Sequence, residues 1–416
     1  MKVLLAPVGS RGDVQPQLLL GDELKKRGHT VTLAAAPNFR SWAEPRGFKF
    51  IPVGEDINTF MRRNAYMTEQ HPVAALPGQI QLLREHIEWQ IGDLFAADHD
   101  ADIVVGAGLC YGGKMVAEKR GVPHVFCCYS LSAMHSAAHP PAVIPLYGMP
   151  RLANRALWSF ITSTFQVTLG TKLNELRRRL GLKPDYDAWK SIHGSETILA
   201  QDAIMGELPS DAPGRNLHVP ALVPHPDSAR PLSDLLERFL RGGSFGSADS
   251  SPVVYLGFGS MPSVDRPRIV QIATDLFERH GARVILQSSH AEEQGIDLPP
   301  GVFPLDDADH ASLFPRVDLI VHHGGAGTTA AALRSGVPQL IVPHIVDQFF
   351  HGRRIAELGV GPAPIPKSKL TADSIAAPLT DRFKYWSKAQ TTRSQLKPAG
   401  GAPQAADHLE HLAGKS

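Results

Sequence analysis

Short apolar runs alternate with longer amphipathic segments along most of the chain. Runs of this length are typical of buried strands, and the segments between them are typical of helices, so the pattern favours βαβ units and a parallel sheet. In the first half it predicts strands at residues 2–6, 30–34, 49–52, 103–105 and 123–129. In the second half it predicts strands at residues 253–256, 283–287, 319–322 and 339–342.

The two halves begin alike, because one predicted strand ends in Val-Gly-Ser at residues 8–10 and another ends in Phe-Gly-Ser at residues 258–260. We therefore predict an α/β protein with two Rossmann-like, doubly wound domains. In such sheets ligands bind beyond the carboxyl ends of the strands, so two facing domains would form a cleft between them. The predicted parts are a first domain over residues 1–225, a linker over 226–251, a second domain over 252–384 and a helical segment over 385–416 that packs back on the first domain.

Composition excludes several classes of partner. The 42 Lys and Arg residues nearly equal the 41 Asp and Glu residues among 416, so no global positive field attracts nucleic acid. No run of about 18 apolar residues occurs, so we expect no membrane-spanning helix, although peripheral membrane contact stays open. The three cysteines do not form the pattern of a secreted disulfide framework, which favours a cytoplasmic location, and Cys127 and Cys128 are expected to pack in a buried strand.

The glycine-rich segment HHGGAGTT, residues 322–329, follows a predicted strand and precedes a predicted helix. Such a turn exposes backbone N–H groups, and the helix N-terminus favours negative charge, so the segment predicts a diphosphate site. Neighbouring strand residues point to opposite faces, so only one histidine can face the site, and His323 is nearest the turn. The alternative is that the glycines only permit a tight turn and the histidines are satisfied core residues.

Further polar residues follow two other predicted strands. Asp347 and Gln348 could hold several sugar hydroxyls, although a helix cap and a surface amide are the alternative. With His344 and His351, Asp347 also resembles a metal cluster, but the spacing matches no complete ligand pattern. Asp13 could act as a general base, or it could cap the helix predicted over residues 16–27.

Three segments together resemble the UDP-glycosyltransferase superfamily: GSRGDVQP at residues 9–16, LFPRVDLIVHHGGAGTT at 313–329 and GVPQLIVPHIVDQFFHGRRIAELGVGPAPIP at 336–366. Within it, the chain is most similar to sterol glucosyltransferases and to bacterial enzymes that glycosylate glycopeptide and macrolide antibiotics. The resemblance covers about the first 55 residues and residues 252–366. It implies the GT-B fold, with the acceptor bound by the N-terminal domain and the nucleotide sugar by the C-terminal domain.

The resemblance also implies residue roles by position. Asp13 matches the catalytic base, and residues 305–310 match the loop beside the nucleobase. The implied donor-binding residues are Ser10, Arg11, Gly12, Ser260, His323, Gly325, Ala326, Gly327, Thr328, Asp347 and Gln348. No metal and no cofactor besides the nucleotide-sugar co-substrate is implied. The chain departs from the family at residues 306–309, which are more acidic, and at residues 349–351, where Phe-Phe-His replaces a proline and an aromatic residue.

We therefore expect an inverting glycosyltransferase that transfers a sugar from a UDP- or dTDP-sugar to a hydroxyl of a small hydrophobic acceptor. A natural product, a sterol or a lipid would fit. Residues 60–147 should line the acceptor side, with residues 135–149 as a mobile apolar wall. The alternatives are a nucleotide-sugar epimerase and a non-catalytic nucleotide-sugar-binding protein.

Overall fold

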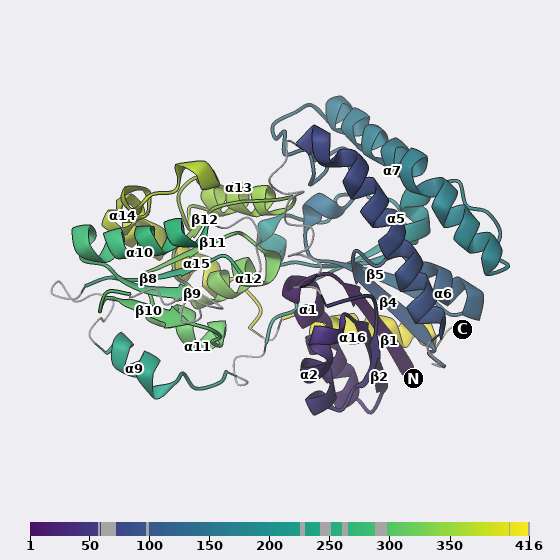
Figure 1. Ribbon diagram of the computed structural model, residues 1–416, viewed down its shortest axis with the longest axis horizontal. Helices are drawn as coiled ribbons and strands as arrows, with labels where there is room; N and C mark the ends of the chain where they lie inside the picture. Colours follow the sequence, from purple (N-terminus) through teal and green to yellow (C-terminus); the bar gives the residue numbers. More distant parts are fainter. Residues whose placement is uncertain are drawn as a thin grey trace. The chain divides into compact units, whose positions relative to one another are not determined.

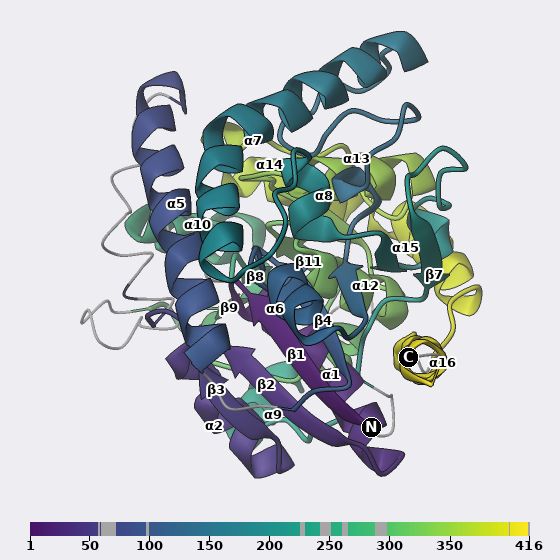
Figure 2. The ribbon, with the colours of Figure 1, turned by 90° about the vertical axis from the view of Figure 1, so that its right-hand side faces the viewer.

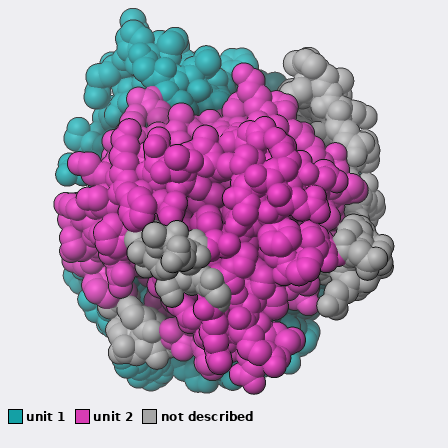
Figure 3. Space-filling view, turned by 90° about the vertical axis from the view of Figure 1, so that its left-hand side faces the viewer, with its two compact units in different colours: residues 1–222, 400–416 teal, residues 223–399 magenta. Residues whose placement is uncertain are grey.

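The computed structural model describes the whole chain except residues 57–58, 60–71, 97–99, 225–228, 242–250, 260–264, 288–297, 399 and 415–416. The chain forms two compact units (Figure 3). Unit 1 contains residues 1–222 and 400–416, and unit 2 contains residues 223–399. Each unit is built on its own parallel sheet, as the alternating pattern predicts, so the α/β class is confirmed.

The sheet of unit 1, of which Figure 1 labels β1, β2, β4 and β5, has seven parallel strands in the order β3-β2-β1-β4-β5-β6-β7. Their bounds are β1 Lys2–Val8, β2 Thr30–Ala35, β3 Lys49–Pro52, β4 Ile103–Gly108, β5 His124–Cys128, β6 Glu196–Ala200 and β7 Arg215–Val219. The strand order reverses between β1 and β4, which are hydrogen-bonded neighbours. This reversal is the position where doubly wound sheets bind ligands.

Helices cover both faces of this sheet. Their bounds are α1 Arg11–Lys26, α2 Arg40–Ala43, α5 Pro72–Ala96, α6 Gly113–Arg120, α7 Arg151–Arg179, α8 Ala188–His193 and α16 Ala402–Ala413. Alternate strand residues face opposite helices: Leu5 packs in the core that contains Leu18 and Leu409, and Leu4 in the core that contains Val116. α16 thus packs against α1 and β7 in unit 1 (Figure 2).

The sheet of unit 2 has five parallel strands in the order β10-β9-β8-β11-β12. Their bounds are β8 Val253–Gly257, β9 Arg283–Gln287, β10 Val302–Leu305, β11 Leu319–His322 and β12 Gln339–Ile341. The helices are α9 Asp234–Leu240, α10 Arg266–His280, α11 His310–Leu313, α12 Ala326–Ser335, α13 Gln348–Leu358, α14 Ala372–Thr380 and α15 Arg382–Ser394. Here the order reverses between β8 and β11, so each unit has one switch point.

Several expectations need correction. The prediction missed β6, β7 and β10, and it started the first helix at residue 16, whereas α1 begins at Arg11. The segment predicted over residues 385–416 is divided, since only its part from Gly400 on belongs to unit 1. The remainder includes most of α15, which is held in unit 2 by the bond from Gln390 Nε2 to the carbonyl oxygen of Gly336, at 3.0 Å. In the described part of the chain, no helix has the length and apolarity needed to cross a bilayer.

Candidate functional site

The candidate base, Asp13, lies in the first turn of α1, directly after β1. Ser10 is the N-cap, and Asp13 is the third helical residue. The Oδ2 atom of Asp13 accepts a hydrogen bond from the Ser10 backbone N–H at 2.9 Å, which completes a capping box. This box starts the helix five residues before Pro16, so Asp13 does not cap a helix that begins there. Asp13 therefore does have a capping role, as the alternative proposed, but the helix that it caps begins at Arg11 and not at Pro16.

Two glycines make room for the Asp13 carboxyl group at the switch point of unit 1. A Cβ on Gly9, after β1, would lie 2.1 Å from Asp13 Oδ2, and one on Gly108, at the end of β4, would lie 2.7 Å from Oδ1. Tyr129, which follows β5, donates its hydroxyl to the Asp13 carbonyl oxygen at 3.2 Å. Three neighbouring strand ends thus position a partly exposed carboxyl group.

The other residues predicted in this turn have different surroundings. Ser10 Oγ accepts the backbone N–H of Gly12 at 3.3 Å as part of the cap. The Arg11 guanidinium lies 5.2 Å from the centre of the Trp42 ring, and its Nε donates to Gln15 Oε1 at 3.2 Å. The structure therefore brings Ser10, Gly12 and Asp13 together, with Arg11 turned onto Trp42 beside them.

In unit 2 the glycine-rich turn leads into α12, as its sequence predicts. The helix begins at Ala326, its N-cap is Gly325, and no side chain of a described residue caps its first turn. Gly325, Ala326, Gly327 and Thr328 all lie in this partly exposed stretch. The amides of an uncapped helix N-terminus are donors for an anion, so this turn has the geometry of a phosphate site.

The two adjacent histidines have different environments. His322 is fully buried, donates from Nε2 to Gln339 Oε1 at 2.9 Å and accepts the Gly324 backbone N–H at Nδ1 at 3.1 Å. The core interpretation is therefore correct for His322. His323 is partly exposed, and its Nδ1 has no hydrogen-bond partner among the described residues.

The His323 ring lies beside the switch point of unit 2. A Cβ on Gly259, just after β8, would lie 3.3 Å from its Cε1, and one on Gly325 would lie 2.5 Å from its Nε2. Burial, together with the neighbouring His344, His351 and His310, lowers the pKa of His323 to about 4. The imidazole is consequently neutral at pH 7, with one N–H to donate and one nitrogen lone pair.

Asp347 and Gln348 stand where β12 leads into α13. Asp347 occupies the N-cap position without making a capping bond, and burial raises the pKa of its carboxyl group. Gln348 is 4% exposed, and its Oε1 accepts the backbone N–H groups of His344 at 2.7 Å and Ile345 at 3.1 Å. Val346, which directly precedes Asp347, has φ 40°, a strained conformation for a β-branched residue. The alternative of a helix cap is thus met by Asp347 in position but not in bonding, and Gln348 is a buried amide and not a surface one.

His351, on α13, supports the glycine turn in a way that its sequence position did not indicate. It is 1% exposed, and its Nδ1 donates to the Gly324 carbonyl oxygen at 2.7 Å. Gly324, at φ 89°, is thus held at its N–H by His322 and at its carbonyl by His351. The Nδ1 of His344 similarly donates to the Val342 carbonyl, at 2.9 Å. Among the described residues no group of three or more His, Cys, Asp or Glu could hold a metal ion.

The remaining predicted residues are distributed as follows. Ser260 lies outside the described residues. In the segment 305–310, Asp309 caps α11 and His310 stacks on Phe314, with ring centres 4.3 Å apart. Cys127 and Cys128 are buried, and burial raises the pKa of both thiols, that of Cys128 to about 12, which agrees with a packing role.

Comparison with known proteins agrees with this architecture. Residues 3–133 match the family model described as the glycosyltransferase family 28 N-terminal domain. Residues 275–401 match the model described as the erythromycin biosynthesis protein CIII-like, C-terminal domain.

Two curated relatives and one solved structure illustrate the similarity. The vancomycin aglycone glucosyltransferase of Amycolatopsis orientalis is 32% identical, over 94% of this chain and 92% of that protein. A sterol 3-beta-glucosyltransferase of Arabidopsis thaliana is also 32% identical, over 91% of this chain but only 62% of its own length. The structure of glycosyltransferase VinC in complex with dTDP has the same fold, with a TM-score of 0.69, 23% identity and full coverage of both chains.

Proposed function

This chain belongs to the UDP-glycosyltransferase superfamily and has its GT-B fold, and on that premise we propose that it transfers a sugar, with inversion, from a nucleoside diphosphate sugar to a hydroxyl group of a small hydrophobic acceptor. The donor is a UDP- or dTDP-sugar. The acceptor is a natural product, a sterol or a lipid alcohol. Names of relatives support these classes, since one glycosylates the vancomycin aglycone, one a sterol, and one was solved with dTDP.

The observation that carries the donor assignment is the uncapped N-terminus of α12 beside His323. The amides of Gly325 to Thr328 and the His323 imidazole are the groups that bind the diphosphate. Asp347 and Gln348 bind hydroxyls of the transferred sugar, with the buried Gln348 amide also keeping the strained turn before it in shape. In unit 1, Ser10, Arg11 and Gly12 complete the contacts to the phosphates.

The reaction begins when the Asp13 carboxylate accepts the proton of the acceptor hydroxyl. The oxygen attacks the anomeric carbon, the bond from that carbon to the diphosphate oxygen breaks, and the nucleoside diphosphate leaves with the bonding electrons. The charge that develops on the leaving group is stabilised by the α12 N-terminus and by the His323 N–H, more strongly than in the bound donor. The proposal requires no metal ion and no cofactor besides the nucleotide sugar.

A donor-by-acceptor screen with mass-spectrometric detection tests the function. UDP- and dTDP-sugars are incubated in pairs with phenolic, polyketide, sterol and lipid alcohols, and a glycosylated acceptor together with free nucleoside diphosphate is the expected result. An isomerised donor formed without acceptor would instead identify an epimerase. Tight nucleotide binding without turnover on any acceptor would identify a non-catalytic binding protein.

A further inference from the structure

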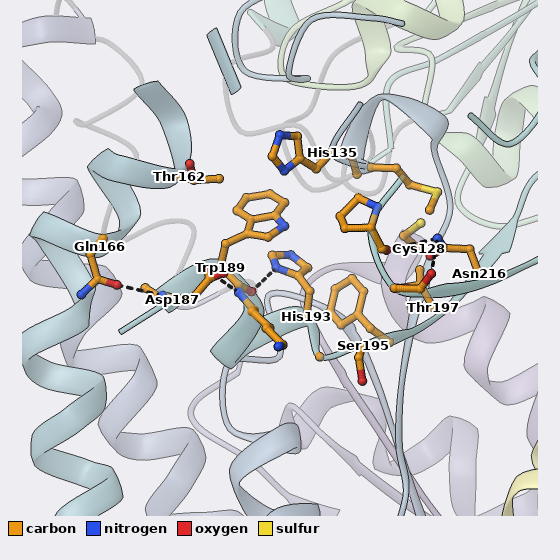
Figure 4. Close-up of a pocket in the computed structure, with 18 of the residues that line it drawn as sticks. Cys128, His135, Thr162, Gln166, Asp187, Trp189, His193, Ser195, Thr197 and Asn216 are labelled. Carbon is orange, nitrogen blue, oxygen red and sulfur yellow. Dashed lines mark hydrogen bonds between the residues drawn. The ribbon is translucent and has the colours of Figure 1, made fainter. Parts of the chain in front are cut away.

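Unit 1 contains a cavity of about 690 Å³ beside its sheet (Figure 4). It lies over the edge formed by β5, β6 and β7, with α7, α8 and the segment that follows β5 as its other walls. Drug-sized ligands occupy pockets of roughly 300–1,000 Å³, so this cavity has room for a molecule of several fused rings. Among the residues that the structure describes, none assigned above to the donor or to proton transfer lines it.

Stacked aromatic rings form one wall of the cavity. The Trp189 indole lies in the middle of this wall, and the His193 imidazole stacks on it with ring centres 4.0 Å apart and an angle of 25°. Phe126 meets His193 edge-on at 4.6 Å, and His135 stacks on the buried Trp158 at 4.9 Å. A packed array of this kind offers a rigid, flat, apolar surface against which another ring can lie.

One polar group in the wall, the His193 imidazole, has a nitrogen that accepts a hydrogen bond. His193 donates from Nδ1 to the Trp189 carbonyl at 2.9 Å, and burial lowers its pKa to about 4, so at neutral pH its Nε2 carries a lone pair. Asn216 donates from Nδ2 to the carbonyl groups of Ala212 and Pro213, and its Oδ1 is buried, so this side chain shapes the wall and does not offer a free acceptor to a ligand. An acceptor nitrogen in an aromatic wall suits a ligand that brings a hydroxyl group.

The end of β5 carries one residue of the cavity wall and one residue that contacts the candidate base. Cys128, the last residue of β5, lines the cavity, and the next residue, Tyr129, donates its hydroxyl to the Asp13 carbonyl. The segment after β5 was predicted to be a mobile wall, but its residues 136 and 139 are held by hydrogen bonds. Ser136 Oγ donates to Asp211 at 2.6 Å, and Trp158 Nε1 donates to the His139 carbonyl at 3.0 Å.

We propose that this cavity binds the ring system of the acceptor, and that the acceptor is a flat polycyclic or aromatic alcohol with at least two hydroxyl groups. Its rings lie against Trp189, one hydroxyl donates to His193 Nε2, and another is the one that receives the sugar. That this molecule is the sugar acceptor rests on the proposed function, whereas its binding to the cavity does not. A sterol with a single hydroxyl is disfavoured, because its only donor is the reacting group.

Two serines of α7 provide a matched test. Both side chains are exposed, but Ser163 lines the cavity and Ser159, one helical turn earlier, does not. A Ser163→Trp variant should obstruct part of the cavity and weaken binding of a trihydroxyflavone, measured by calorimetry, at least about tenfold, whereas Ser159→Trp should bind it as the wild type does. A His193→Phe variant keeps the stacked ring but loses the acceptor nitrogen, and should bind the flavone about fivefold more weakly. Each variant should bind UDP as the wild type does, which shows that it is folded.

The outcomes separate the inference from the proposed function. The inference is overturned if Ser163→Trp leaves flavone binding and the acceptor KM unchanged, or if cholesterol binds as tightly as the trihydroxyflavone. In both cases sugar transfer by the wild type would still support the proposed function. If the flavone binds and Ser163→Trp blocks it, but no acceptor is ever glycosylated, the cavity is a binding site and the proposed function fails.

Discussion

His351 donates its Nδ1 proton to the carbonyl oxygen of Gly324 across 2.7 Å, which ties α13 to the glycine turn before α12. The helix that carries the proposed sugar-binding pair and the turn that carries the proposed diphosphate site are thereby held in one arrangement. Both groups are buried, so the bond is not exchanged for one with water.

Replacing His351 by Phe should test this support. The Gly324 carbonyl would lose its partner, and an unsatisfied buried carbonyl costs about 1–3 kcal/mol, so the unfolding midpoint should fall and UDP affinity should drop about tenfold. His351→Gln, which can still donate, should recover part of both. The control is Arg353→Ala, on an exposed part of the same helix. UDP binding that is unchanged in His351→Phe would remove His351 from any role in positioning the turn.

The two roles of Asp13 can be separated by two substitutions. Asp13→Asn keeps an oxygen that accepts the Ser10 N–H but has no basicity, so kcat should fall at least about 100-fold with stability nearly unchanged. Asp13→Ala should lose the same activity and, in addition, about 0.5–2 kcal/mol of stability through loss of the capping box. Steady-state kinetics and thermal unfolding measure both. Full activity in the Asn variant would show that another group accepts the proton.

The space around His323 provides a steric test of the donor site. Since a Cβ on Gly325 would lie 2.5 Å from His323 Nε2, Gly325→Ala must displace the imidazole. Its affinity for UDP should fall by about the same factor as in His323→Ala, about tenfold or more. Gly92→Ala is the control, because a Cβ there meets nothing within 4 Å. Calorimetry that finds wild-type affinity in both site variants would refute the assignment of His323 to the diphosphate.

Donor binding should depend on pH through the same histidine. The pKa of His323 is about 4 without ligand, and the charge of a bound diphosphate raises the pKa of a neighbouring imidazole. Binding then takes up a proton, so the affinity for a nucleotide sugar, whose diphosphate does not titrate near neutrality, should rise as the pH falls from 8 toward 6. The rise should vanish in His323→Ala. A flat profile in the wild type would mean that His323 binds only as the neutral ring.

Stability should decline in mild acid because of His322. Burial lowers the pKa of His322 to about 3, against about 6.5 in the unfolded chain, so the unfolded state alone binds the proton as the pH falls below 6.5. Between pH 6.5 and 5.5 this residue removes about 1 kcal/mol of unfolding free energy. In urea titrations His322→Asn should be less stable at pH 7 but lose less between the two pH values. Equal losses in both proteins would contradict the prediction.

The sequence predicted the fold best where apolar runs are bounded by turn residues, as in β1, β9 and β11. The missed strands β6 and β7 are near one edge of their sheet, and the Arg215–Val219 sequence RNLHV has too few apolar residues to stand out. The start of α1 was misplaced because the Pro16 signal obscured the capping box of Ser10 and Asp13.

In the candidate site, too, some residues could be predicted from the sequence and others could not. Asp13, His323 and the Asp347–Gln348 pair follow strand ends, and position along the chain is enough to find such residues. The supporting contacts join residues distant in sequence, 27 positions apart for His351 and Gly324 and 116 for Tyr129 and Asp13. One sequence contains no signal for such pairs, since only the folded sheet brings them together.

Because the chain leaves unit 1 after Leu222 and returns at Gly400, unit 1 contains segments from both sides of unit 2. The returning helix, α16, buries Leu409 in the core that contains Leu18, and Arg27 bonds Asp407 at 2.6 Å and Glu410 at 3.1 Å. A ribosome that has released residues 1–222 has therefore not yet supplied the parts that close the α1 face. Unit 1 therefore cannot be completed until all of unit 2 has been synthesised, although its own first residues are the first to emerge.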